Sequence, residues 1–206
     1  MQEQEGVIQF DLHWRQTNVI RADLAALNAW RSILCKLDLI GQDLQRYNGV
    51  GFGNVSQRYG TEDQFIISGT QTGHIAHTDE SHYALVTDFD PDTNRVVAEG
   101  PLRPSSESMT HGVIYRLDDS VNCIVHVHSP DIWNVASKLV LPMTRAEVAY
   151  GTPEMASEVS RLFRETDVRE RGIFGMAGHR DGVVAFGSSP EIAGVALIKI
   201  LARSAG

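Results

Sequence analysis

The amino-acid sequence predicts a single α/β domain in which helices cover a central sheet. Short apolar runs typical of strands alternate with amphipathic helical segments, and no repeat, linker or low-complexity tract interrupts them. A length of 206 residues fits one domain, residues 1–206, whose core needs no disulfide for stability. We expect residues 1–20 to form an N-terminal arm or an edge strand of this domain.

The first half of the chain is expected to hold one helix followed by strands. Apolar residues at helical spacing predict a helix within 21–40, with Gly41 as its C-cap. The segment NGVGFGNVSQRYG, residues 48–60, reads as a glycine-rich loop. Short apolar runs bounded by turn residues then predict strands at 64–68, 81–89 and 95–100.

The second half is expected to alternate helices with buried strands. The predicted helices span 107–117, 131–139, 151–165 and 188–204. Thr152 and Ser189 are N-cap candidates, each followed by a proline in the first helical turn. The predicted strands are 122–128, 171–178 and 181–187.

Composition narrows the class of protein. The net charge of −8 argues against a nucleic-acid-binding face, which is basic. The two cysteines, Cys35 and Cys123, lie among apolar neighbours and read as buried thiols in a reducing compartment. The N-terminus lacks the pattern of a signal peptide, and no apolar stretch reaches the length of a membrane span. We therefore expect a cytoplasmic protein with no membrane partner.

Two histidines at alternate positions stand out in the predicted strand 122–128. Residues i and i+2 of a strand point to the same face, so His126 and His128 can direct two imidazoles at one cation. Taken alone, the pair fits two hydrogen-bonded histidines equally well. A catalytic zinc usually has a third protein ligand, and His179 in the turn AGHRDG is a candidate, although histidines in such turns are commonly surface residues.

Three further segments could bind an anion. Ser105 and Ser106 precede a predicted helix, where free backbone N–H groups favour anions, and Glu107 follows them in PSSE. Segments 51–56 (GFGNVS) and 68–73 (SGTQTG) combine glycines with small polar side chains that can approach a phosphate or carboxylate. Neither segment is a Walker A or GxGxxG motif. Taken alone, each segment is better explained as an ordinary turn or helix cap.

The order of these motifs resembles the class II aldolase/adducin family, which includes fuculose-1-phosphate aldolase and ribulose-phosphate epimerases. The ordered set is GNVS, SGxxTG, PSSE with His111 four residues on, HxH, and a late glycine-flanked histidine. The resemblance extends over about residues 20–200. It implies a three-layer α/β/α fold with a largely antiparallel central sheet, and a homotetramer with the active site near a subunit interface.

The resemblance also implies a site and a reaction. The implied metal ligands are His126, His128, His179 and Glu107, with Glu107 also the catalytic acid/base. They would bind one divalent metal ion per chain. Zn²⁺ is the expected ion, and other divalent transition metals are alternatives. The implied phosphate-binding residues are Asn54, Thr72, Gly73, Ser105 and Ser106. The implied reaction is aldolase-type C–C cleavage of a small hydroxy-carbonyl compound, a sugar phosphate, through a metal-stabilised enediolate.

The sequence departs from the aldolases at several positions. The late histidine is followed by Arg180 and Asp181 where the family often has HHG. Glu147 occupies the position expected for a proton-donating tyrosine, and Tyr150 lies three residues away. The family's C-terminal tyrosine also has no counterpart before Gly206.

These departures leave other functions open. A dehydratase similar to methylthioribulose-1-phosphate dehydratase, an epimerase or a decarboxylase could use the same metal site. A non-catalytic adducin-like scaffold is the alternative outside enzymes, although adducin heads lack the metal histidines. Because the anion loops contain no lysine and only Arg58 and Arg103 flank them, a substrate carboxylate remains an alternative to a phosphate.

Overall fold

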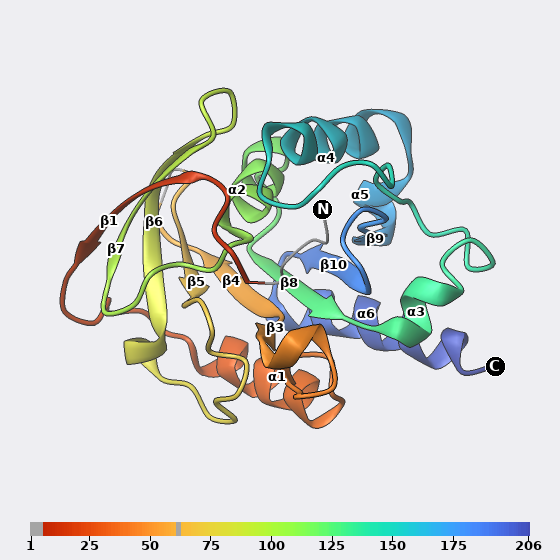
Figure 1. Ribbon diagram of the computed structural model, residues 1–206, viewed down its shortest axis with the longest axis horizontal. Helices are drawn as coiled ribbons and strands as arrows, with labels where there is room; N and C mark the ends of the chain where they lie inside the picture. The colour runs from red at the N-terminus through yellow and green to blue at the C-terminus, as the bar shows by residue number, and fades with distance from the viewer. Residues whose placement is uncertain (1–5, 61–62) are drawn as a thin grey trace.

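The computed structural model describes residues 6–60 and 63–206, and an eight-stranded sheet runs through its centre (Figure 1). The strand order is β1-β7-β6-β5-β4-β8-β10-β9. The β1–β7 pair is parallel and the other neighbouring pairs are antiparallel. The strands are β1 (Asp11–Gln16), β4 (Asn54–Arg58), β5 (Phe65–Ser68), β6 (Tyr83–Asp90), β7 (Arg95–Gly100), β8 (Cys123–His128), β9 (Ile173–Gly175) and β10 (Gly182–Gly187). A separate pair is formed by β2 (Gly41–Gln42) and β3 (Gly51–Phe52).

Helices cover both faces of the sheet. The helices are α1 (Ala25–Lys36), α2 (Ser108–Leu117), α3 (Pro130–Asn134), α4 (Pro153–Glu165), α5 (Val168–Arg171) and α6 (Pro190–Ser204), with 3₁₀ turns η1 (Tyr47–Gly49) and η2 (Glu80–His82). Figure 1 shows α2 and α4 above the sheet and α1 and α6 below it. The predicted three-layer α/β/α arrangement with a largely antiparallel sheet is confirmed. Within the described residues, no helix is both long and apolar enough to cross a bilayer.

Successive side chains of β8 point to opposite faces of the sheet and so enter two different hydrophobic cores. Cys123, Val125 and Val127 pack into the core between the sheet and helices α1 and α6, whereas Ile124 packs into the core between the sheet and helices α2 and α4. All six residues of β8 are buried, and β4 and β10 flank the strand on either side. His126 and His128 therefore leave β8 on the α2/α4 side of the sheet.

Helix α1 ends in a different C-capping arrangement from the predicted one. The helix stops at Lys36 with Leu37 as C-cap, and Gly41 belongs to β2, so the prediction of Gly41 as C-cap was wrong. Asp38 takes the left-handed conformation that glycine usually supplies there, with φ of 55°. The amides of Asp38 and Leu39 donate to the carbonyls of Cys35 and Leu34, which is the Schellman pattern.

Two other segments differ from expectation. The predicted glycine-rich loop contains β4, a strand in the middle of the sheet, because Gly53 (φ of 77°) turns the chain out of β3 and buried residues follow it. The predicted helix 131–139 is reduced to α3, since the amides of Val135 and Ala136 bond three residues back to Ile132 and Trp133. Strand β1 lies at one edge of the sheet, and residues 1–5 of the expected arm or edge strand lie outside the described residues.

Candidate active site

Three buried histidines converge at the end of β8. The Nε2 atoms of His126 and His128 lie 3.2 Å apart. His179 belongs to the turn between β9 and β10, and its ring centroid lies 5.3 Å from that of His126 and 4.7 Å from that of His128. Gly182 begins β10 opposite His128, and this register brings the turn back over the strand end. Each histidine offers one ring nitrogen, and the three nitrogens lie within 4.8 Å of one another.

The environment of the three histidines suits a cation. His126 and His128 are fully buried and His179 is 2% exposed. Burial, reinforced by His179, lowers the pKa of His126 and of His128 well below the ordinary value, so both rings are neutral near pH 7. Neutral imidazole is the form that binds metals. Tetrahedral zinc with Zn–N bonds of about 2.0–2.1 Å separates two nitrogens by roughly 3.4 Å, close to the observed spacing. The triad therefore fits a divalent metal ion.

A carboxylate lies beside the triad. Glu107 is the residue immediately before α2, is 2% exposed, and places Oε1 3.9 Å from His179 Nε2. Its backbone N–H donates to the Ser105 hydroxyl. The three-histidine group does not include Glu107, so the structure brings it next to the predicted metal site without placing it among the converging nitrogens.

The glycine-rich segment joins the histidine strand directly. Asn54 and His126 are partners in the antiparallel register of β4 and β8, so their side chains share a face. A Cβ on Gly53 would stand 3.1 Å from the carbonyl oxygen of His126, which explains the need for glycine beside Asn54.

The SGTQTG and PSSE segments meet each other. Gly69 and Pro104 form an isolated antiparallel bridge, and the amide of Thr70 donates to the Arg103 carbonyl at 3.0 Å. A Cβ on Gly73 would collide with the Gly41 carbonyl oxygen, so this turn packs tightly on the β2–β3 pair. The side chains predicted to bind phosphate are all buried, with exposures of 4–5%: Asn54, Thr72, Ser105 and Ser106. The structure thus brings together every predicted anion-binding segment.

The two arginines that flank these segments face elsewhere. The Arg58 guanidinium donates to the carbonyls of Tyr115, Asp118 and Val121. The Arg103 guanidinium lies over the Trp14 ring, 5.7 Å from its centroid. These contacts direct neither cation at the triad.

Two aromatic side chains lie beside the triad: Tyr150, which the sequence analysis named without giving it a role, and Tyr47, which it missed. The Tyr47 hydroxyl donates to Asp181 Oδ2 at 2.7 Å, and the Tyr47 ring centroid lies 4.6 Å from that of His128. The Tyr150 ring is buried 4.6 Å from the His179 ring, whereas Glu147, which the resemblance assigned to the position of the aldolase tyrosine, is exposed. Nothing in the local sequence RYNG marks Tyr47, because the loop that carries it meets Asp181 only through the fold.

A buried polar network lies behind the triad. His111 on α2 is fully buried, and its Nδ1 lies 2.7 Å from the Ser56 hydroxyl, which lies 2.8 Å from the Tyr115 hydroxyl. Burial lowers the pKa of His111 to about 3. The histidine that follows PSSE is therefore neutral and hydrogen-bonded to the strand that carries Asn54.

A cavity of about 940 Å³ opens beside the anion-binding segments. Its walls include Ile40, Arg46, Phe52, Gly73 and His74. The three histidines do not line it. Phe52 connects the two regions, since its ring lies 5.7 Å from the His128 ring.

The chain is similar in sequence or in fold to several known proteins. The chain is 32% identical over 103 residues to a methylthioribulose-1-phosphate dehydratase of Stenotrophomonas maltophilia, and the match covers 45% of this chain but only 44% of that relative. Its fold is similar to that of L-fuculose-1-phosphate aldolase from Thermus thermophilus (TM-score 0.63, 19% identity, 88% of this chain and 90% of that chain). A sugar-phosphate aldolase from Thermotoga maritima is also similar (TM-score 0.61, 16% identity, 87% and 90% covered).

The structural likenesses, at these identities, concern the fold alone. The sequence profile described as Class II Aldolase and Adducin N-terminal domain matches residues 41–201, a region that contains the histidine triad, Glu107 and the three candidate anion-binding segments. With the fold, the histidine triad and this match in agreement, the chain belongs to the class II aldolase and adducin N-terminal domain family.

Proposed function

We propose that this protein is a divalent-metal-dependent lyase acting on a small phosphorylated hydroxy-carbonyl compound. The observation that carries the proposal is the convergence of three buried imidazoles, two of them held neutral by burial, with a buried carboxylate 3.9 Å from the third. Membership of the family supports it, as do the sugar-phosphate names of the similar proteins.

The roles follow from the positions of the side chains. His126, His128 and His179 would hold the ion, and Glu107 would complete the ligand set in the resting enzyme. Zn²⁺ suits three imidazoles and a carboxylate, and other divalent transition metals can bind the same donors. When bound, such an ion polarises the substrate carbonyl as a Lewis acid. Asn54, Thr72, Gly73, Ser105 and Ser106 would hold the phosphate end.

The Glu107 carboxylate would move the proton. In aldol cleavage it takes the proton of the hydroxyl group on Cβ, and that carbon becomes the carbonyl of one product. The electron pair of the broken Cα–Cβ bond moves towards the original carbonyl, and the proton then returns to Cα. Because Glu107 and the histidines are at most 2% exposed, bulk water is kept from the reacting carbon. The segments that hold the phosphate would orient the substrate over this carboxylate.

Elimination of water is the second candidate reaction. Here the same carboxylate would remove the proton on Cα, and the β-hydroxyl would leave as water after receiving a proton. The specific observation in its favour is the sequence identity of 32–35% to methylthioribulose-1-phosphate dehydratases. The exposed Glu147, at the position where the resemblance expects the aldolase tyrosine, points the same way. Epimerisation begins with the same proton removal.

Metal content and product analysis test the proposal. Wild-type protein, a His126→Ala/His128→Ala variant and a control His74→Ala/His77→Ala variant, which changes two exposed histidines, are analysed for metals. We expect about one divalent ion per chain in wild type and control, and none in the triad variant. An equal metal content in all three proteins, or no metal in any of them, rejects the proposal and favours the non-catalytic scaffold.

The loaded protein is then incubated with fuculose 1-phosphate and with methylthioribulose 1-phosphate. Two carbonyl fragments indicate aldol cleavage, and a single product lighter by one water indicates dehydration. Light scattering on the same sample tests the homotetramer that the family resemblance implies.

A further inference from the structure

Arg31 on α1 is a buried cation attached to the SGTQTG turn. It is 1% exposed, although arginine is rarely buried without an ionic partner. Its Nη1 donates to the Ile75 carbonyl and its Nη2 to the Thr72 carbonyl, both at 2.7 Å. The fold thereby ties α1 to a turn more than 40 residues further along the chain.

The charge of Arg31 has no carboxylate partner in the part of the chain that the structure describes. No acidic side chain there lies within 4.0 Å of the guanidinium, and the buried Nε has no hydrogen-bond partner. Carbonyl groups satisfy two donors but leave the positive charge in place, whereas buried charges in proteins are normally compensated by an opposite charge. The missing opposite charge is the observation that points to a ligand.

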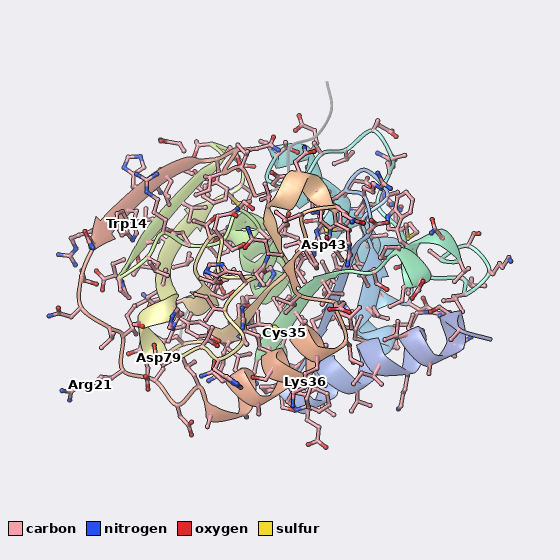
Figure 2. The ribbon with its side chains drawn as sticks, turned by 60° about the horizontal axis from the view of Figure 1, so that its bottom comes forward. Trp14, Arg21, Cys35, Lys36, Asp43 and Asp79 are labelled. Carbon is pink, nitrogen blue, oxygen red and sulfur yellow. The ribbon has the colours of Figure 1, made fainter. Side chains whose placement is uncertain are left out.

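The turn held by Arg31 belongs to the candidate anion site. Ile75 N–H and Arg31 share the Thr72 carbonyl, and the Thr72 hydroxyl donates to the Gly69 carbonyl at 2.8 Å, so the turn is rigid. Arg58 and Arg103 are engaged with other groups. Figure 2 brings the α1 side forward and marks Arg21 before the helix and Lys36 at its end, both exposed. Arg31, by contrast, is buried and donates to the backbone carbonyls of Thr72 and Ile75.

We propose that Arg31 is a positioning residue that makes the SGTQTG turn an anion subsite. It fixes the turn through the Thr72 and Ile75 carbonyls, and its charge is compensated when the phosphate group of a substrate occupies the far side of the turn. The inference rests on the proposed function in that it names the group that recognises the phosphate. It explains how the loops bind a phosphate although they contain no lysine.

Titration with inorganic phosphate tests Arg31 without any turnover. Calorimetry compares wild type, Arg31→Lys, Arg31→Met and the control Arg21→Met, in which an exposed arginine of the same region is changed. Loss of a buried positive charge that attracts the anion at an effective dielectric constant of about 20 predicts a Kd weaker by roughly 10-fold or more in Arg31→Met. Lysine keeps the charge but not the two-pronged contact, so Arg31→Lys should stay within about fivefold of wild type.

The outcomes separate this inference from the proposed function. Wild-type affinity in Arg31→Met, equal losses in both Arg31 variants, or no phosphate binding by the wild type overturns the role of Arg31, and none of these results affects the metal analysis. If Arg31→Met does not fold, ¹⁵N spectra of the wild type replace it. Phosphate should then shift the Arg31 Nε–H signal and the amides of Thr72 and Gly73 saturably, and unmoved signals overturn the inference.

Discussion

Asn54 lies directly opposite His126 in the antiparallel ladder between β4 and β8. Side chains of such partners stand about 5 Å apart on the same face of the sheet. A candidate phosphate-binding amide and a candidate metal ligand are therefore placed by one pair of hydrogen-bonded strands. The Oδ1 atom of Asn54 is buried without a hydrogen-bond partner among the described residues, which leaves it available to a substrate hydroxyl.

Asn54→Ala should weaken substrate binding and spare the metal. A hydrogen bond to a charged phosphate contributes about 1.5–3 kcal/mol, so KM or the Kd for inorganic phosphate should rise roughly 10- to 100-fold. Asn54→Asp keeps the side-chain size but repels the anion, and its loss should be at least as large. Gln57→Ala on the same strand serves as the control. Unchanged phosphate binding in Asn54→Asp would exclude Asn54 from the anion site.

Glu107→Gln should abolish turnover more than it reduces metal binding. The substitution keeps the shape and removes the base, so kcat should fall by about 10²- to 10⁴-fold. The three imidazoles remain, and about one metal ion per chain should still be found by elemental analysis. Glu107→Asp, which retains a carboxylate, is the control. Loss of the metal together with activity would instead identify Glu107 as chiefly a structural ligand.

Tyr47→Phe should destabilise the loop over the triad. The hydroxyl bonds the Asp181 carboxylate, and both Tyr47 and Asn48 have left-handed backbones, with φ of 48° and 57°. Losing a hydrogen bond to a charged group costs about 1.5–3 kcal/mol. Urea unfolding should show this loss, while the retained ring keeps its contact with His128 and the metal content stays near wild type. Tyr59→Phe is the matched control, and equal stability of the two variants would contradict the role of the hydroxyl.

His111 should make the metal-free protein sensitive to acid. The folded-state pKa of His111 is lowered to about 3, whereas the unfolded chain titrates at about 6.5. The unfolded state therefore binds the proton first, so the stability tied to the neutral ring is complete above pH 6.5 and is lost as the pH falls towards 3. Between pH 7 and pH 4.5 this amounts to about 2.5 kcal/mol.

A His111→Asn variant isolates that contribution. It can still donate to or accept from Ser56, but it has no proton to gain. Its free energy of unfolding should fall by about 2.5 kcal/mol less than that of wild type between pH 7 and pH 4.5. Denaturant titrations at the two pH values measure the difference. Parallel losses in wild type and variant would show that other groups dominate acid unfolding.

Much of the fold could be predicted from the sequence because strand periodicity and helix caps are set by residues close together in the chain. Strand β7 and the caps Thr152 and Ser189 lie where the pattern places them. The end of α1 could not be read in this way, since Asp38 adopts a left-handed conformation that sequence reasoning assigns to glycine. Strand β4 was hidden for the opposite reason, because glycines on either side of it resemble a loop.

The candidate site likewise contains some residues that local sequence connects and others that only the fold brings together. His126 and His128 could be paired from sequence because strand periodicity fixes their common face. Tyr47 and Asp181 are 134 residues apart, and Arg31 reaches a turn 41 residues away, so no local pattern connects them. The choice between Glu147 and Tyr150 depended on which side chain turns inward, a property of the irregular segment between α3 and α4.

The place of β8 between β4 and β10 has a consequence for the order of assembly. In zinc fingers the ion is needed before the chain can fold, because the ligands converge only around it. Here a fully buried strand within an eight-stranded sheet carries two of the three candidate ligands, His126 and His128, so the sheet positions both imidazoles without an ion. An ion would then add stability only by mass action. The protein should therefore stay folded in the presence of a chelator, and the identity of any metal bound at the triad would be set by cellular supply as much as by the protein.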